Sequence, residues 1–231
     1  MDFSRQLELY DAENEQDKAT VIGVGATGSW VSLILSKLGV SAIKMYDMDI
    51  IEGHNVPNQL YSVHDVGKIK VAMCKKYCDV LGSNNTDVTQ RAIKIDKDNW
   101  IHPDEGSVIF CLVDSMAARK EIFDMIVDNG RKYTWIETRM GLTGYRIYMI
   151  DTTNEKEVAK YRETLYSDDE AEVSACGTSQ SIVTTAVQCA SHAVGLWLAK
   201  KNEAEYVPNE IIFDVHSSFI MSRKFDKEKE E

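Results

Sequence analysis

The sequence lacks several features that mark particular protein classes. No apolar run reaches the roughly 18 residues needed to span a bilayer, so we expect no membrane insertion. Lys and Arg number 26 against 37 Asp and Glu, and the formal net charge of -11 disfavours nonspecific binding to nucleic acid. Cys-x-x-Cys pairs are absent, which argues against a structural zinc site with four cysteines. Cys74 and Cys78 are instead predicted to be buried or half-buried free thiols.

Cysteine usage and the N-terminal sequence bear on the compartment. The chain has 5 cysteines, an odd number, and its first residues are charged and lack the apolar core of a secretory leader. We therefore expect a cytoplasmic protein, because thiols stay reduced there. An apolar content of 44% over 231 residues suffices for one α/β core without disulfides. We predict a single domain at 1–222 and a charged tail at 223–231.

The spacing of apolar residues predicts alternating strands and helices, which is the pattern of a doubly wound, Rossmann-like, mostly parallel sheet. The first part should contain strands at 20–24, 42–46, 89–93 and 108–112 and helices at 27–38, 68–81 and 115–127. Two further strands, at 133–138 and 144–151, flank a Met-Gly-Leu-Thr-Gly turn. Residues 152–175 are polar and acidic, which indicates an exposed connector, and a helix at 182–200 should pack in the core or a dimer interface.

Three glycines stand where the first predicted strand meets the first helix. Gly23, Gly25 and Gly28 form a Gly-x-Gly-x-x-Gly turn after a β-branched run. In such turns one glycine permits the sharp bend, one lets the backbone approach a phosphate, and one lets helix and strand pack closely. The N–H groups at the helix start would then face an anion. NAD, FAD, S-adenosylmethionine and ATP all bind to turns of this kind, so the motif alone leaves the ligand open.

The loop after the second predicted strand favours a triphosphate. Asp47 stands about twenty residues past the turn, where an acid can accept hydrogen bonds from a ribose, and NAD would suit it equally well. Beyond it the sequence continues with polar residues: Asp49, Asn55, Asn58, Gln59 and Lys70. A polar loop that closes with lysines at a helix start suits triphosphate and metal better than a dinucleotide.

Five ordered motifs resemble those of the ThiF/MoeB-type adenylyltransferases, which activate ubiquitin-like and sulfur-carrier proteins. The matching segments are the glycine turn, Asp47-Met-Asp49, Asn55-Val-Pro-Asn58-Gln59, Gly67-Lys-Ile-Lys70 and, after an apolar strand, Asp114 with Arg119 five residues later. Family members also carry an Arg-Gln pair near their N-terminus, which reaches the nucleotide of the partner subunit across a dimer interface. Arg5-Gln6 matches this pair. The resemblance spans most of the chain and implies a C-terminal antiparallel extension to the sheet.

This resemblance implies adenylation by MgATP of the C-terminal carboxylate of a small ubiquitin-like or sulfur-carrier protein, carried out by a homodimer. Asp114 would help to hold Mg2+, and Lys70 and Arg5 would touch phosphates, Arg5 from the partner subunit. Asp47 would hold the ribose, and Asn55 and Gln59 would orient backbone and phosphate contacts. Some relatives use a cysteine in the crossover region to form a thioester or persulfide, and Cys176 occupies a comparable position.

One departure from the family pattern keeps other functions open. The arginine that precedes the family's glutamine is Asn58 here, and asparagine cannot neutralise phosphate charge. A catalytically degenerate, ATP-binding scaffold protein is therefore one alternative. An NAD-dependent oxidoreductase is another, although it would leave Lys70, Asp114 and Arg5 without a common purpose.

Overall fold

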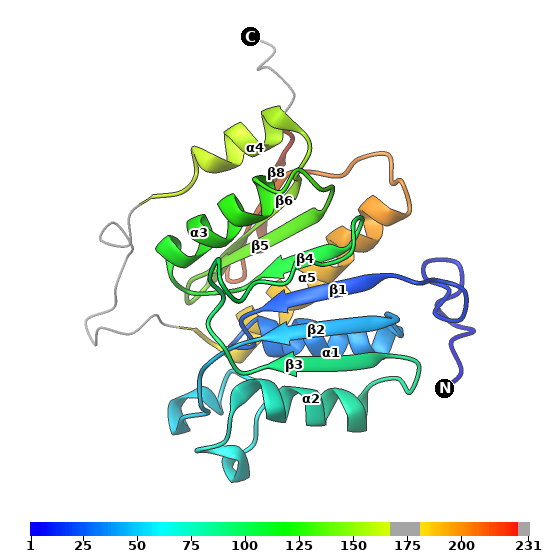
Figure 1. Cartoon of the computed structure of the whole chain (residues 1–231), viewed down its shortest axis with the longest axis vertical. Helices are drawn as coiled ribbons and strands as arrows, with labels where there is room; N and C mark the ends of the chain where they lie inside the picture. The colour runs from blue at the N-terminus through cyan, green and yellow to red at the C-terminus, as the bar shows by residue number, and fades with distance from the viewer. Residues whose placement is uncertain (167–180, 226–231) are drawn as a thin grey trace.

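The computed structural model describes residues 1–166 and 181–225 of the chain. Within these residues, strands form one sheet in the order β3-β2-β1-β4-β5-β6-β7-β8 (Figure 1). The strands are β1 (Lys18–Ile22), β2 (Ala42–Tyr46), β3 (Asp87–Arg91), β4 (Val108–Cys111), β5 (Thr134–Met140), β6 (Gly144–Asp151), β7 (Glu210–Asp214) and β8 (Phe219–Arg223). The first five pair in parallel, whereas β6, β7 and β8 extend the sheet in antiparallel fashion. The predicted fold class is confirmed.

Helices cover both faces of the sheet, and each face has its own apolar core. The helices are α1 (Gly28–Leu38), α2 (Lys70–Leu81), α3 (Met116–Val127), α4 (Glu155–Arg162) and α5 (Val183–Lys201). One core holds apolar side chains of α1, α2 and α5, and the other holds those of α3 and α4 (Figure 1). Cys74 and Cys78 are buried free thiols in the first core, as predicted. No helix in the described ranges is long and apolar enough to cross a membrane.

Local sequence explains most element boundaries. Ser115 caps α3, because its hydroxyl accepts a hydrogen bond from the Ala118 N–H, and Gly39 ends α1 in the left-handed conformation. The prediction of an exposed connector was wrong at Glu155–Arg162, which form α4. Asn154 caps this helix, and Val158 and Tyr161 anchor it on the sheet.

The end of the chain differs from expectation as well. Two strands that we did not predict complete the sheet: β7 pairs with β6, and β8 pairs with β7. Strand β8 ends at Arg223, where we place the start of the charged tail, and residues 226–231 of that tail lie outside the described residues.

Candidate functional site

The glycine turn connects β1 to α1 at the position in the parallel part of the sheet where the order of the strands reverses. Strands β2 and β3 lie on one side of β1 and β4 on the other, and ligands of such sheets bind at the carboxyl ends of the strands around this point. Gly23 has a positive φ of 86°, and a Cβ there would lie 2.8 Å from the Leu112 carbonyl oxygen. A Cβ on Gly28 would lie 1.9 Å from the Gly23 carbonyl oxygen, whereas one on Gly25 would meet nothing within 4 Å.

These contacts predict different effects of two alanine substitutions on the free energy of unfolding. Gly28→Ala should lower the free energy of unfolding by about 3 kcal/mol or more, because the methyl group overlaps backbone that cannot move aside. Gly25→Ala should leave that free energy within about 1 kcal/mol of the wild type, because the space is open. It should nevertheless weaken ATP binding, since the methyl group would stand where a phosphate approaches. Urea unfolding and calorimetric titration with ATP measure both effects, and a Gly25→Ala protein that binds ATP normally would contradict the assignment of the turn.

Asp47 ties the glycine turn to the loop after β2. Its carboxylate accepts hydrogen bonds from the backbone N–H groups of Val24 and Asp49, both at 2.8 Å. Burial raises the pKa of Asp47 above its usual value. Lys70, at the start of α2, is buried, and its Nζ donates to Asp49 Oδ2 at 2.9 Å. The structure therefore brings the turn, both aspartates and Lys70 into one hydrogen-bonded group.

The loop that contains Asn55, Asn58 and Gln59 is fixed against the start of α1. Asn55 is buried, and its side chain accepts a hydrogen bond from the Glu52 N–H, so its role is partly structural. The Trp30 indole donates to the Asn58 carbonyl oxygen at 3.2 Å. Within the described residues, the amide oxygens of Asn58 and Gln59 are buried without a hydrogen-bond partner. Amides in this state are suited to contact a polar ligand.

Asn58 also joins the loop to the start of α5. Its Nδ2 donates to the hydroxyl of Ser181, which lies 123 positions further along the chain. Sequence reasoning missed this contact, and also the hydrogen bond from the Tyr61 hydroxyl to the Val24 carbonyl oxygen at 2.7 Å. No local pattern marks either one, because the partners are 123 and 37 positions apart in the sequence.

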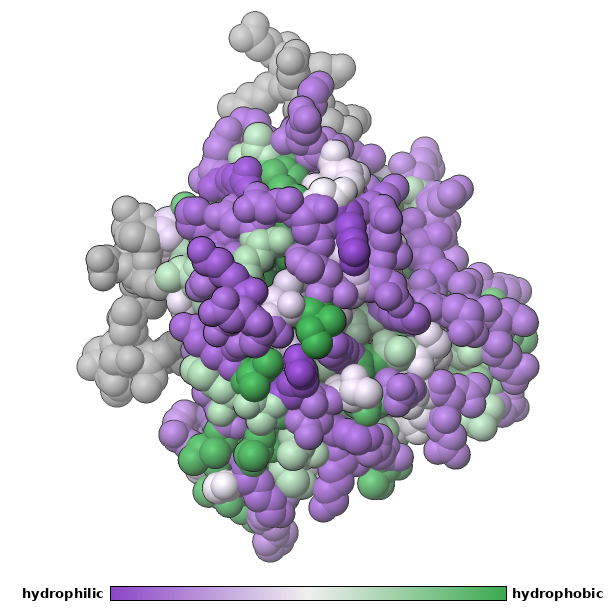
Figure 2. Space-filling model, viewed as in Figure 1, coloured by the Kyte–Doolittle hydropathy of each residue, from purple (hydrophilic) through white to green (hydrophobic). Residues whose placement is uncertain are grey.

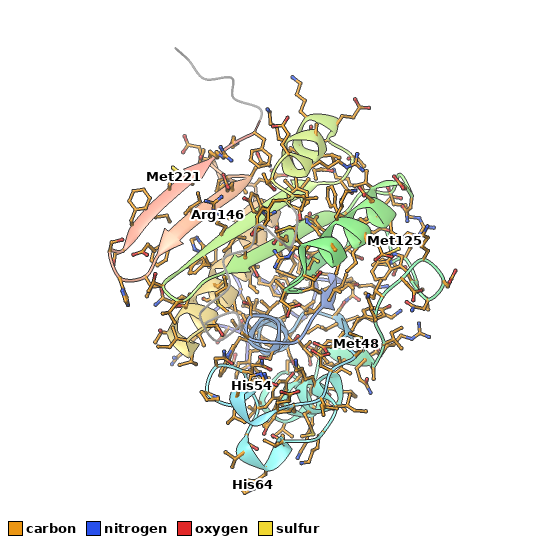
Figure 3. All side chains as sticks on the ribbon, turned by 90° about the vertical axis from the view of Figure 1, so that its left-hand side faces the viewer. Met48, His54, His64, Met125, Arg146 and Met221 are labelled. Atoms are coloured by element: carbon orange, nitrogen blue, oxygen red, sulfur yellow. The ribbon has the colours of Figure 1, made fainter. Side chains whose placement is uncertain are left out.

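Asp114 is exposed and follows β4 at the same edge of the sheet. The β1–β4 pairing continues to this edge, where the Leu112 N–H donates to the Ile22 carbonyl oxygen at 2.8 Å. The segment that follows β4 and contains Asp114 therefore lies beside the glycine turn, which follows β1. Figure 3 looks on to this edge and labels Met48, which lies between Asp47 and Asp49 in the sequence.

A buried charged cluster that sequence reasoning did not single out lies beside Asp114. Glu137 on β5 accepts hydrogen bonds from Arg119 and Arg139, and Arg119 also donates to the carbonyl oxygen of Val113. The signal was present in the sequence, since Glu137 directly follows the apolar residues Trp135 and Ile136 within the predicted strand at 133–138. A carboxylate in such a position needs partners of opposite charge.

Arg5 lies apart from the other predicted residues of its own chain. It is exposed, and the neighbouring Gln6 donates to the carbonyl oxygen of Leu38 at 2.8 Å. Leu38 ends α1, whereas the glycine turn begins it, so about 16 Å of helix separates the two. Arg5 therefore does not meet Lys70 and Asp114 within one chain. Its predicted action from a partner subunit stays a prediction.

The carboxylates of the site suit a Mg2+ ion that binds together with the nucleotide, and not one that the protein binds alone. The described residues contain no cluster of three or more His, Cys, Asp or Glu side chains that could hold a metal ion. Mg2+ in nucleotide sites needs one or two carboxylates, because phosphates and waters complete its coordination. Exposed Asp114 at the sheet edge meets this requirement. Cys176 lies outside the described residues.

Comparison with known proteins fits this geometry. The model of the ThiF family matches residues 3–230. PaaA has a similar structure, with a TM-score of 0.68 and 16% identity over 99% of this chain and 76% of PaaA. The microcin C7 biosynthetic enzyme MccB in complex with N-formylated MccA gives 0.75 and 16% over 93% of this chain and 66% of MccB.

A further structure, of E. coli MccB with AMPCPP and MccA, gives a TM-score of 0.72 and 18% identity over 93% of this chain and 65% of that one. The chain thus spans slightly less than two thirds of MccB, and at these identities the likeness shows the fold alone. No curated protein matches the sequence. The family match covers nearly the whole chain, and the protein belongs to the ThiF family.

Proposed function

We propose that this protein uses ATP to adenylate the C-terminal carboxylate of a small ubiquitin-like or sulfur-carrier protein, releasing pyrophosphate. Membership of the ThiF family supports ATP-dependent adenylation of a carboxylate as the type of reaction. One observation carries the proposal for this chain. An open glycine turn, buried Lys70 and exposed Asp114 gather at the carboxyl ends of adjacent strands. This is where sheets of this kind bind nucleotides.

The reaction needs no nucleophile from the enzyme. A carboxylate oxygen of the carrier protein attacks the α-phosphorus of ATP, the bond from that phosphorus to the bridging oxygen breaks, and pyrophosphate leaves. The protein contributes alignment and charge neutralisation. Lys70 would move from Asp49 to a phosphate, the N–H groups of the glycine turn would bind another, and Asp47 would accept from the ribose. Gln59 would contact a phosphate through its amide nitrogen, because phosphate oxygens accept hydrogen bonds.

Asp114 would hold Mg2+ together with ATP. When bound, Mg2+ neutralises phosphate charge and so helps pyrophosphate to leave. Asp114 meets the requirement of an accessible carboxylate, because it is exposed beside the turn.

A protein substrate is supported by the surface next to the site. The connection between β2 and α2 exposes large apolar side chains, which are Met48, Ile50, Val63, Val66 and Ile69. Figure 2 shows apolar surface at the lower left, where Figure 1 places this connection. Exposed apolar groups next to a polar site are typical of surfaces that bind other proteins. Structures of MccB include complexes with MccA, which is a parallel within the same fold.

The proposal is tested by ATP–pyrophosphate exchange in the presence of small proteins that end in Gly-Gly. We expect radioactive pyrophosphate to enter ATP only when enzyme, carrier protein and Mg2+ are all present. Deletion of the carrier's last glycine should abolish the incorporation. Exchange that proceeds without any carrier carboxylate would contradict the proposed substrate.

Asn58 supports one alternative, a protein that binds ATP without turning it over. The Asn58 amide hydrogen-bonds with Ser181. Lys68 pairs with Asp65, whereas Lys70 pairs with Asp49 at the edge of the sheet. Of these two lysines, Lys70 is therefore the one placed to neutralise phosphate charge. The alternative predicts calorimetric ATP binding with no exchange for any carrier. Under our proposal, Lys70 and the partner's arginine replace the missing charge, and binding and exchange occur together.

A further inference from the structure

The cluster around Glu137 connects two distant stretches of backbone through one buried carboxylate. We call Glu137, Arg119, Arg139 and Tyr161 the Glu137 cluster. Glu137 has 0% exposure, and its partners Arg119 and Tyr161 come from α3 and α4. Arg139 Nε donates to its two oxygens at 3.2 and 3.0 Å, and the Tyr161 hydroxyl donates to one of them at 3.3 Å. Arg119 also donates a hydrogen bond to a carboxylate oxygen of Glu137.

Each arginine of the cluster also holds a backbone carbonyl. Arg119 donates to the carbonyl oxygen of Val113, the residue immediately before Asp114. Arg139 donates to the carbonyl oxygen of Thr164 at 2.7 Å and to its hydroxyl at 3.0 Å. A guanidinium group can do this because its donors form a rigid planar fork. Glu137 thus fixes two arginines, and the arginines fix the chain before Asp114 and the chain after α4.

The arrangement does more than hold the core together. A buried ion pair adds little net stability when its desolvation is considered, and packed apolar residues often replace such a pair without loss. What apolar residues could not supply is a fixed hydrogen bond to the Val113 carbonyl oxygen. This contact holds the backbone immediately before Asp114, in the segment that follows β4. Outer partners of metal-binding side chains commonly act in this way.

We propose that Glu137 is a positioning residue that acts through Arg119 on the Val113–Asp114 turn and so sets the carboxylate for Mg2+ and ATP. The inference rests on the function proposed above, because it concerns the same site. Glu137 itself would not touch substrate. Its substitution should therefore alter the dependence on Mg2+ while contacts of Lys70 and of the glycine turn persist.

The chain contains a matched control at Glu210. This carboxylate on β7 is 1% exposed and also pairs with two arginines, Arg146 and Arg223, but it lies in the antiparallel part of the sheet. Glu137→Gln and Glu210→Gln each remove one buried negative charge and leave two arginines without it. Arg146 and Arg223 are about half exposed whereas Arg119 and Arg139 are largely buried, so Glu137→Gln should destabilise the protein more, and the control compares where in the chain the effects appear.

The first test uses the protein without ligand and measures amide hydrogen exchange. In Glu137→Gln, we expect exchange at residues 112–116 and 163–166 to accelerate about 10-fold or more, because both carbonyl contacts loosen. Glu210→Gln should accelerate exchange only around β7 and β8. Equal protection of residues 112–116 in both variants would overturn the proposal.

The second test measures the Mg2+ concentration that half-saturates ATP–pyrophosphate exchange. We expect Glu137→Gln to raise it about 10- to 100-fold, the usual effect of losing an outer partner of a metal ligand, and Glu210→Gln to leave it unchanged. Arg119→Lys should shift it in the same direction, because lysine keeps the charge but lacks the fork that reaches Val113. This variant covers the case in which Glu137→Gln does not fold.

The two proposals fail separately. If the wild-type protein shows no exchange with any carrier, the proposed function is wrong, and hydrogen exchange still decides the role of Glu137. If the wild type exchanges normally and the Mg2+ dependence of Glu137→Gln matches that of Glu210→Gln, the positioning role alone is wrong.

Discussion

Asp114→Asn should reduce the rate of ATP–pyrophosphate exchange about 1,000-fold, equivalent to about 4 kcal/mol of transition-state stabilisation. The substitution keeps the size of the side chain and removes its negative charge. Asparagine is a poor Mg2+ ligand, so the phosphates would lose most of the charge neutralisation that the metal provides. Because Asp114 is exposed, the fold should be unaffected. Initial rates at saturating ATP and carrier, with thermal unfolding as a check on folding, measure the effect.

A matched control is Asp128→Asn. Asp128 is likewise exposed and caps the other end of α3, away from the glycine turn. Its substitution should leave exchange unchanged. Excess Mg2+ should recover part of the activity of Asp114→Asn if the side chain binds the metal. Full activity of Asp114→Asn at ordinary Mg2+ concentrations would remove Asp114 from the site.

Arg5→Ala should reduce exchange on the order of 100-fold, the usual effect of losing one donor to developing charge. Since Arg5 lies at the far end of α1 from the glycine turn of its own chain, we expect the loss to arise in the partner's site. Two inactive variants should therefore complement each other. When Arg5→Ala and Asp114→Asn chains are co-expressed and assort at random into dimers, about a quarter of all sites have both residues intact.

The experiment separates action within a chain from action between chains. Mixed dimers isolated through two different affinity tags should be active, and dimers of either variant alone should be nearly inactive. If mixed dimers are as inactive as the parents, Arg5 acts on its own chain or not at all. Normal exchange by Arg5→Ala would exclude the predicted phosphate contact itself.

The residues that could be predicted from the sequence are those whose roles depend on local backbone geometry. The glycine turn is an example, because the contacts of Gly23 and Gly28 follow from the requirements of any sharp turn between strand and helix. The common sheet edge of Asp47 and Asp114 was predictable for a related reason. Each follows a strand, and parallel strands end at the same edge.

Other features depend on neighbours that the sequence does not identify. In α4 only Val158 and Tyr161 are buried, so apolar periodicity was too weak to indicate the helix. The cap at Asn154 with Glu157 three residues later was the usable signal. Strands β7 and β8 did have a local signal that our prediction missed, because their sequences EIIFD and FIMSR are short apolar runs on either side of a polar turn. The hydrogen bond between Asn58 and Ser181 joins positions 123 apart, which no local pattern marks.

The two hydrogen bonds that Asp47 accepts from Val24 and Asp49 have a consequence for ligand affinity. They immobilise the phosphate-binding loop in the free protein, so the conformational entropy of that loop is lost during folding rather than on binding. The glycine turn is in this sense preorganised, and a nucleotide would meet N–H dipoles that are already oriented.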